Sequence, residues 1–267
     1  NIHLDLLEND LIPDPFFGKN ENDLQWISDE DWVYRMSFIP NKNILSRKNI
    51  ELFFHGIDTY ADVYLNDTKV IKADNMFHPW RAKVKDIIKD GDNELIVHFR
   101  SALKEKLSTI NSLDYSLPAD NDQAGKTSPF TRKAPYHFGW DWGPCFVTSG
   151  LCGSVELFGW DDWFVDQVCI VNKEVSKEKA KLGVEVNIQS IANNDLSVNI
   201  NEVRTGQKDK HSTEIKPGHN ILEFPISVEN PDLWWPIGHG PQPLHEFSID
   251  IQTKSHTQTI KKKVGIR

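Results

Sequence analysis

Apolar and polar residues alternate with a period of two along most of this chain. Successive side chains of a β-strand point to opposite faces, so this period predicts strands with one buried face. The runs that show it best are Ile50, Leu52 and Phe54; Ala61, Val63 and Leu65; Leu95, Val97 and Phe99; Leu182, Val184, Val186 and Ile188; Leu196, Val198 and Ile200; and Phe247, Ile249 and Ile251. Asn66 and Asp67 lie between two strand-like runs and predict a hairpin turn. We therefore expect an all-β protein made of antiparallel strands.

One short segment departs from the period of two. Ser101–Leu107 begins with a residue typical of helix N-caps and places Leu103 and Leu107 four residues apart, which predicts a short helix. The polar stretch 114–128 follows it and is rich in Asp, Asn, Pro and Gly. Its length predicts a functional surface loop.

The strand pattern restarts after residue 160, which predicts a domain boundary there. A chain of 267 residues is long enough for two ordinary domains. Strands broken by turn signals at Thr205-Gly206 and Pro217-Gly218 indicate a second β-sandwich of seven to nine strands. We expect one domain over residues 1–160 and the other over residues 161–267.

The net charge argues against two classes of partner, and the cysteine spacing argues against a zinc site. The 39 acidic and 30 basic residues give a net charge of −9, which repels phosphate backbones and anionic lipids, so we expect no nucleic-acid and no membrane partner. The N-terminus shows no basic and apolar leader. Cys145, Cys152 and Cys169 lack zinc-site spacing and are expected to be reduced packing residues; a disulfide between Cys145 and Cys152 is the alternative.

The segment from Arg132 to Gly150 carries the most specific chemical signal. Asp141 stands between Trp140 and Trp142, just before Gly143-Pro144. Indole rings stack on the apolar C–H faces of sugars, while a carboxylate accepts hydrogen bonds from neighbouring hydroxyls. Asp141, Trp140 and Trp142 are therefore candidate sugar-binding residues. The alternative is structural, with the indoles filling space between sheets and Asp141 capping a turn.

Other polar residues lie within this segment, and one further polar pair lies on an early loop. His137 could line the same pocket, although a single histidine is usually satisfied by a neighbour. Arg132 and Lys133 form a basic pair on a loop, which is usually solvated. Asn20 and Glu21 lie on an early loop and are expected to be exposed turn residues.

This chain resembles, over its whole length, the N-terminal half of family 2 glycoside hydrolases of the β-mannosidase type. The resemblance is carried by Leu11–Glu21, Asp31–Tyr34, Arg132–Pro144, Asp232–Pro236 and Val264–Arg267. It implies a jelly-roll sugar-binding domain over residues 1–160, an immunoglobulin-like sandwich over residues 161–267, and a (β/α)8 barrel that begins after Arg267. The two catalytic glutamates would lie in that barrel, so this chain would contain no catalytic residue.

The resemblance also implies an activity for the parent protein. It would remove β-linked mannose from the non-reducing end of an oligosaccharide by a retaining mechanism. The partners of this chain would be an oligosaccharide with terminal β-mannose, bound through Asp141, Trp140, Trp142 and His137, and the C-terminal barrel of the same polypeptide. Neither a cofactor nor a metal is implied. A β-glucuronidase or β-galactosidase fragment and a free-standing carbohydrate-binding or adhesion module are the alternatives. The sequence does not determine the compartment, and a periplasmic, secreted or lysosomal parent is favoured over a cytoplasmic one.

Two features of the second domain are expected to be structural. Trp234 and Trp235 are adjacent and should point to opposite faces, one into the sandwich and one against the barrel. Lys261, Lys262 and Lys263 are expected to lie on a solvated edge strand, where charge discourages unwanted pairing.

Overall fold

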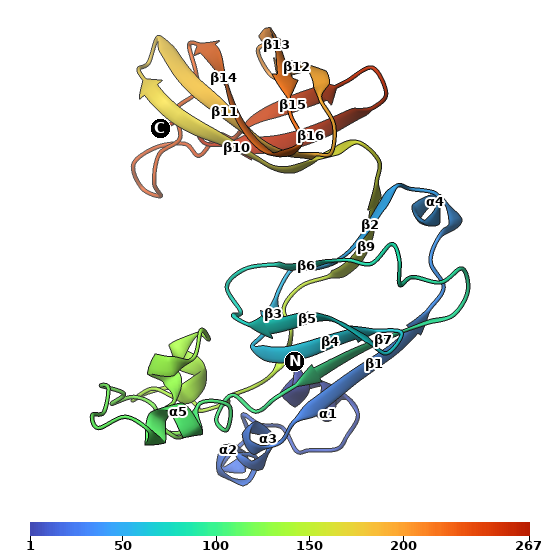
Figure 1. Cartoon of the computed structure of the whole chain (residues 1–267). Coiled ribbons are helices and arrows are strands. Elements are labelled where there is room, and N and C mark those ends of the chain that lie inside the picture. Colours follow the sequence, from blue (N-terminus) through green and yellow to red (C-terminus); the bar gives the residue numbers. More distant parts are fainter. The chain divides into compact units, whose positions relative to one another are not determined.

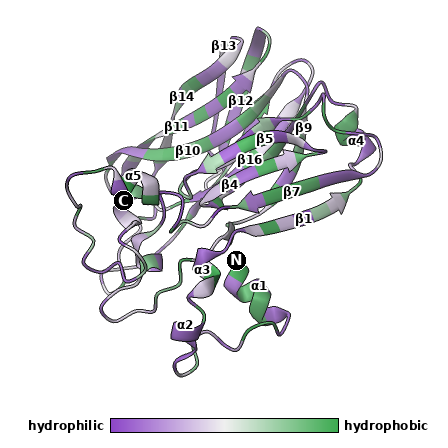
Figure 2. Cartoon of the chain, turned by 60° about the horizontal axis from the view of Figure 1, so that its bottom comes forward, coloured by the Kyte–Doolittle hydropathy of each residue, from purple (hydrophilic) through white to green (hydrophobic).

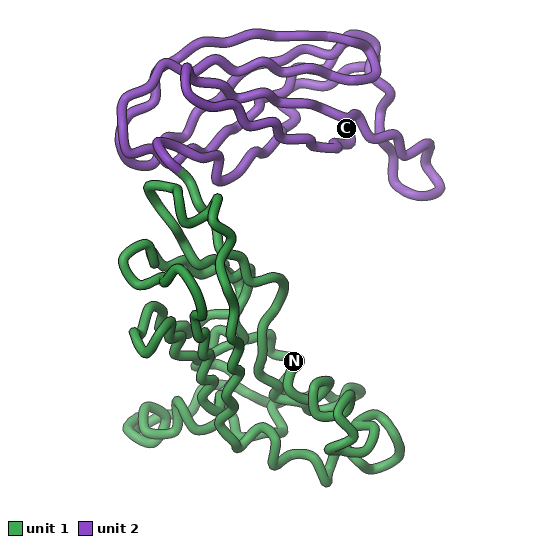
Figure 3. The backbone as a smooth tube through the Cα atoms, turned by 90° about the vertical axis from the view of Figure 1, so that its right-hand side faces the viewer, with its two compact units in different colours: residues 1–160 green, residues 161–267 purple.

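The computed structural model describes residues 1–267, which divide into two compact units, unit 1 (Asn1–Trp160) and unit 2 (Asp161–Arg267) (Figures 1 and 3). Strands dominate both units, which confirms the all-β prediction. Green and purple bands alternate along the strands in Figure 2, which is the period of two seen in the sequence. No helix combines the length and the apolar character needed to cross a membrane.

Unit 1 contains two main antiparallel sheets, with the strand orders β1-β7-β4-β5 and β6-β2-β9, and a small β3-β8 sheet. Its strands are β1 (Trp32–Phe38), β2 (Asn49–Phe54), β3 (Ile57–Asp58), β4 (Tyr60–Leu65), β5 (Thr68–Asp74), β6 (Trp80–Lys83), β7 (Asn93–Phe99), β8 (Gly150–Leu151) and β9 (Val155–Trp160). Its α-helices are α1 (Ile2–Glu8), α2 (Asn20–Asp23), α3 (Trp26–Asp29), α4 (Lys42–Leu45) and α5 (Leu107–Asn111). The apolar faces of β2, β4 and β7 that the sequence predicts are buried in one shared core, which confirms them. Burial of each valine, leucine, isoleucine or phenylalanine side chain among them stabilises the fold by about 1.5–3 kcal/mol.

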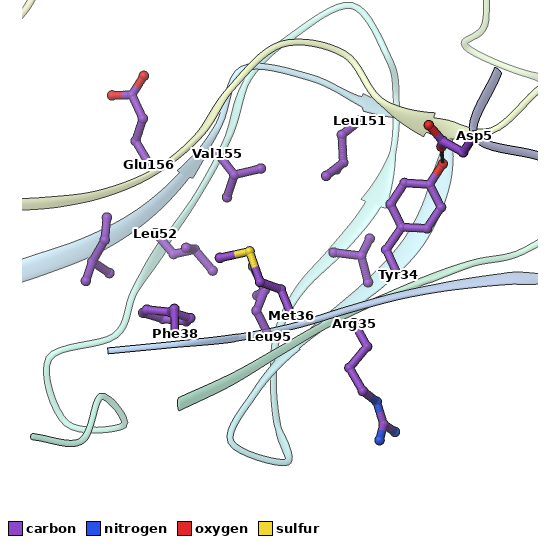
Figure 4. A pocket seen from close by; sticks show the side chains of 12 residues that line it. Asp5, Tyr34, Arg35, Met36, Phe38, Leu52, Leu95, Leu151, Val155 and Glu156 are labelled. Carbon is purple, nitrogen blue, oxygen red and sulfur yellow. Dashed lines mark hydrogen bonds between the residues drawn. The ribbon is translucent and has the colours of Figure 1, made fainter. Parts of the chain in front are cut away.

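An apolar cavity of about 540 Å³ opens between the two main sheets of unit 1, beside β1 and β9 (Figure 4). Met36, Leu52 and Val155 are among the residues that line it. At one end of the cavity the Tyr34 hydroxyl donates a hydrogen bond to Asp5, and burial together with this bond raises the pKa of Tyr34. With so few polar groups inside, the cavity offers little to a hydroxyl-rich ligand.

The predicted hairpin turn joins β4 to β5. Asn66 and Asp67 have φ values of 48° and 65°, as a type I′ turn requires at both central positions. The Asn66 amide also donates to Asn93 Oδ1 at 2.7 Å, and its Oδ1 accepts from the Glu94 N–H at 3.0 Å. The turn is therefore fixed by its backbone and by one side chain.

Asp67→Gly is expected to raise the free energy of unfolding by about 0.5 kcal/mol, because glycine removes the steric cost of a positive φ and keeps every hydrogen bond of the turn. Asn66→Gly is the matched control and is expected to destabilise, because it removes the amide contacts to Asn93 and Glu94. Urea unfolding of the variants measures both effects. A destabilised Asp67→Gly variant would contradict this account of the turn.

Unit 2 is a sandwich of a three-stranded sheet, β10-β11-β14, and a four-stranded sheet, β13-β12-β15-β16. Its strands are β10 (Trp163–Val175), β11 (Lys179–Ser190), β12 (Asn194–Glu202), β13 (Lys208–Ile215), β14 (Gly218–Glu229), β15 (His245–Gln252) and β16 (Thr257–Val264). The predicted apolar faces of β11, β12 and β15 form its core, which confirms them. The lysines 261–263 lie on the edge strand β16, also as predicted.

The tryptophan pair of unit 2 differs from the prediction. Neither ring lies in the core, because both residues belong to the irregular segment that follows β14. Trp234 is half-buried beneath the Arg267 guanidinium, 5.3 Å from the ring centroid, and Trp235 is 44% exposed. The prediction of one ring inside the sandwich is therefore wrong.

The helix predicted at Ser101–Leu107 is also wrong. Residues 102–106 form turns, and α5 begins only at Leu107. Ala102 and Leu103 are buried against Tyr60 and Phe138, and the Ser101 hydroxyl donates to the Ser28 carbonyl at 2.6 Å. These tertiary contacts override the local helix signal.

Helix α1 is an element that the sequence prediction missed. Asn1 caps it by accepting a hydrogen bond from the Leu4 N–H at 3.2 Å, and Ile2 and Leu6 are buried one turn apart. The cap and the i, i+4 apolar pair were visible signals, but the helix covers only seven residues.

All three cysteines are free thiols, so the alternative of a Cys145–Cys152 disulfide is wrong. Cys145 is buried, as expected for a packing residue, and burial raises the pKa of its thiol to about 11. Cys152 and Cys169 are exposed, which corrects the expectation that they pack inside. Cys169 lies on the outer face of β10, between Val168 and Ile170, whose side chains belong to the core of unit 2 or pack against it.

Candidate functional site

The segment that carries the candidate residues, here named the tryptophan loop (residues 132–149), contains no strand and only one 3₁₀ turn, Pro135–Phe138. It is held instead by side chains from other parts of unit 1. Gln123 donates from its Nε2 to the Trp140 carbonyl at 2.8 Å, and its N–H donates to the Phe138 carbonyl at 2.8 Å. These bonds fix the backbone on the N-terminal side of Asp141.

The other side of the loop is fixed by helix α2 and by Gln25, the N-cap residue of α3. Glu21 Oε1 accepts a hydrogen bond from the Cys145 N–H at 2.6 Å, and Gln25 Nε2 donates to the Cys145 carbonyl at 2.9 Å. Asn20 and Glu21 are half-buried residues of α2, so the prediction that they are exposed turn residues is wrong. Their role was hidden in the sequence because Glu21 and Cys145 are 124 residues apart.

Lys133 is the largest departure from the sequence prediction. Its side chain is 0% exposed, whereas Arg132 beside it is exposed as expected. Lys133 Nζ lies 2.6 Å from each carboxylate oxygen of Asp58 and 2.7 Å from the Thr148 carbonyl oxygen. Burial lowers the pKa of Lys133, but three acceptors need three N–H donors, so the side chain is an ammonium ion. Asp58, on β3, is a residue that sequence reasoning missed.

Five aromatic rings line a cavity of about 560 Å³ on the tryptophan loop, here named the aromatic cavity. They belong to Phe16, Tyr136, Trp140, Trp142 and Phe146, and the polar residues Asn1, His137 and Thr148 share the lining. The Trp140 and Trp142 rings meet edge to face with centroids 5.4 Å apart. Trp142 is 81% exposed, so the alternative in which both indoles fill space between sheets is wrong.

Asp141 lies outside the lining of the aromatic cavity, although both its neighbours belong to it. The indoles contact each other, so the carboxylate is not braced between them as the sequence suggested. Asp141 is exposed and has no hydrogen-bond or ion-pair partner within the chain, which also rules out a turn-capping role. Its oxygens are therefore free to accept hydrogen bonds from a ligand.

His137 lines the aromatic cavity, and its side chain is 16% exposed. Its Nδ1 lies 3.6 Å from Asp58 Oδ2. Burial and then the charge of Lys133 lower the pKa of His137 to about 4, so the imidazole is neutral at neutral pH. His3 lies behind the same wall, with Nδ1 3.0 Å from Thr148 Oγ1, and burial and Lys133 also lower its pKa to about 4.

No group of three or more His, Cys, Asp or Glu side chains is arranged to hold a metal ion. The polar groups in or near the aromatic cavity include two neutral imidazoles, the Asn1 side chain, the hydroxyls of Thr148 and Tyr136, and one balanced ion pair. Such a set suits a neutral ligand that offers hydroxyl donors and apolar faces, which is the chemistry of a sugar ring.

Each of the two units matches a known protein family. Residues 1–153 match the glycosyl hydrolase 2 galactose-binding domain-like family, and residues 164–267 match glycosyl hydrolases family 2. The chain belongs to glycosyl hydrolase family 2. The resemblance found in the sequence is therefore confirmed, as is the fold class of a jelly-roll, galactose-binding-like sandwich followed by an immunoglobulin-like one.

Individual relatives agree with this assignment. The β-mannosidase B of Thermothelomyces thermophilus is 31% identical over 272 residues, which cover 100% of this chain and 31% of that protein. The crystal structure of a β-D-mannosidase from Dictyoglomus thermophilum superposes with a TM-score of 0.90 at 35% identity, covering 100% of this chain and 33% of that one. An exo-chitosanase from Amycolatopsis orientalis shares the fold, with a TM-score of 0.73 at 18% identity over 99% of this chain and 29% of that one. The chain thus spans about a third of the length of the mannosidases it matches.

Proposed function

We propose that this chain is the non-catalytic N-terminal part of a retaining exo-β-mannosidase and that its tryptophan loop forms one wall of the active site. The observation that carries the proposal is the exposed, unpartnered Asp141 carboxylate on an irregular loop that side chains from other parts of unit 1 hold at several points. The 35% identity to a β-D-mannosidase over the whole chain supports mannose as the sugar.

The proposed division of labour assigns the chemistry to a (β/α)8 barrel of the same polypeptide. A retaining glycosidase needs two carboxylates about 5–5.5 Å apart, one as nucleophile and the other as acid and then base. In the proposal both come from the barrel, and this chain contributes recognition. Asp141 accepts hydrogen bonds from hydroxyls of the terminal sugar, and Trp142 offers an apolar face to a ring.

Contacts remote from the reacting carbon still affect the rate. They fix the position of the sugar before bond cleavage and can favour a distorted ring, so their binding energy lowers the barrier. His137 and Trp140 extend this surface into the aromatic cavity, where further sugar units of an oligosaccharide would find aromatic faces. The proposed substrate is therefore an oligosaccharide with a terminal β-mannose.

Asp141→Ala in the full-length polypeptide is expected to lower kcat/KM on a nitrophenyl β-mannoside by about 10- to 150-fold, the equivalent of about 1.5–3 kcal/mol for lost hydrogen bonds to a charged group. The fold should not change, because the carboxylate has no partner in the chain. Asp90→Ala, at another exposed aspartate of unit 1, is the matched control and is expected to keep the wild-type value.

Three outcomes would contradict the proposal. Unchanged kinetics of Asp141→Ala would remove Asp141 from the site. A wild-type enzyme that prefers a nitrophenyl galactoside or glucuronide to the mannoside would overturn the sugar assignment, and sugar binding without hydrolysis would favour a free-standing carbohydrate-binding module.

A further inference from the structure

Four titratable side chains lie in the wall of the aromatic cavity or directly behind it, and recognition of a sugar uses at most one of them directly. They are Asp58, Lys133, His3 and His137. We infer that Lys133 and Asp58 are positioning residues of the sugar site: Lys133 ties both ends of the tryptophan loop to strand β3, and Asp58 orients His137 toward the cavity. This inference rests on the proposed function and adds two residues to its site.

The first step of the argument is the geometry around Lys133. Residue 133 and Thr148 are 15 residues apart, and the segment between them carries all four candidate sugar-binding residues. One ammonium group bonds to Asp58 on β3 and to the carbonyl of Thr148, so it joins the start of the loop, the end of the loop and the sheet. Asp58 also pairs with Gly150 of β8, two residues after Thr148. The ends of the loop are therefore fixed together.

The second step concerns His137. Its Nδ1 is buried without a hydrogen-bond partner, 3.6 Å from Asp58 Oδ2, whereas its Nε2, which also has no bond within the chain, is accessible to solvent. A neutral imidazole carries one proton, and a proton on Nδ1 faces the Asp58 carboxylate, whereas a proton on Nε2 would leave the Nδ1 lone pair against that carboxylate. Nε2 is then an acceptor at the cavity wall. A sugar hydroxyl can donate to it.

The third step is the cost of the arrangement. Burying an ammonium and a carboxylate is expensive, and apolar residues of similar volume can often replace such a pair without loss of stability. A purely structural role would therefore not require charge at these two positions. Positioning does require hydrogen-bond donors at residue 133, because the Lys133 ammonium bonds to Asp58 and to the Thr148 carbonyl together and an apolar side chain could bond to neither.

Kinetics of full-length variants test the role of Lys133. Lys133→Met is expected to lower kcat/KM on the mannoside by about 100-fold, since a shift of about 1 Å in a substrate contact has effects of this size. The double variant Lys133→Met, Asp58→Asn is free of the unpaired charge, so it should regain most of the lost Tm while kcat/KM stays low. Recovery of both the Tm and kcat/KM in the double variant would show a structural role only and overturn the inference.

A matched control separates positioning from general destabilisation. Asp62 on β4 is 15% exposed and pairs with Arg100 at 2.9 Å and Lys69 at 3.1 Å, away from the tryptophan loop. Asp62→Asn is expected to lower the Tm and to leave kcat/KM within about 2-fold of wild type, in contrast to the larger effect of a displaced contact. An equal loss of kcat/KM in Asp62→Asn would overturn the inference.

¹⁵N NMR of the histidine rings in the 267-residue chain tests the role of Asp58 without an activity assay. At pH 7 the His137 ring is expected to carry its proton on Nδ1, and Asp58→Asn should shift the population toward the Nε2–H tautomer. A wild-type ring protonated mainly on Nε2 would overturn this part. If the wild-type full-length enzyme fails to hydrolyse the mannoside, the proposed function fails, whereas the tautomer measurement still decides whether Asp58 orients His137.

Discussion

Lys133→Met is expected to lower the free energy of unfolding of unit 1 by about 3–5 kcal/mol, because it leaves a buried carboxylate without its cation. The Asp58 side chain is 3% exposed and its two oxygens both accept from Lys133. A loss of this size is a large share of the stability of an ordinary domain, which is about 5–15 kcal/mol. Native-state hydrogen exchange of the β3 and β8 amides measures it, and the β11 and β14 amides of unit 2 serve as an internal reference.

The control for this prediction is Lys69→Met. Lys69 pairs with Asp62 at 3.1 Å, but its side chain is 44% exposed, so the variant is expected to cost about 1 kcal/mol or less. The comparison tests whether burial or the mere presence of an ion pair determines the loss. Equal effects at the two lysines would show that the Lys133–Asp58 pair is worth no more than a surface pair.

The strands and the core could be predicted from sequence because the information is local. Each predicted strand shows its buried face as a period of two, and the turn at Asn66-Asp67 is encoded by two adjacent residues that tolerate positive φ. The helix prediction at Ser101–Leu107 failed because the information that decides its structure is not local. Its local pattern suits a helix, but Ala102 and Leu103 pack against Tyr60 and Phe138, which no local pattern reveals.

The candidate site was only half visible in the sequence. Trp140, Asp141 and Trp142 are adjacent, so their unusual composition could be recognised directly. The residues that hold them are distant: Asp58 lies 75 residues before Lys133, and Glu21 lies 124 residues before Cys145. A lysine on a loop is usually solvated. Lys133 is buried because it pairs with Asp58, a residue that is distant in the sequence.

Unit 1 is expected to lose stability as the pH falls from 6.5 toward 4, because His3 and His137 must accept protons that their buried sites disfavour. Their pKa values are lowered from 6.5 to about 4, first by burial and then by the charge of Lys133. Between these pH values the unfolded chain binds more protons than the folded one, so the free energy of unfolding rises with pH. The contribution is fully present above pH 6.5 and is lost on the way down to pH 4, at about 3 kcal/mol for each imidazole. Urea unfolding at a series of pH values measures it.

The interval from pH 5 to 6.5 isolates the histidines in this measurement, because the carboxylates of an unfolded chain titrate mainly below it. A double variant, His3→Gln with His137→Gln, is expected to flatten the pH dependence of unit 1 across this interval. His78→Gln, at an exposed histidine of unit 1, should leave the wild-type slope intact. If the double variant keeps that slope, the two imidazoles are not the groups that take up the protons, and the neutral His137 required at the cavity wall loses its support.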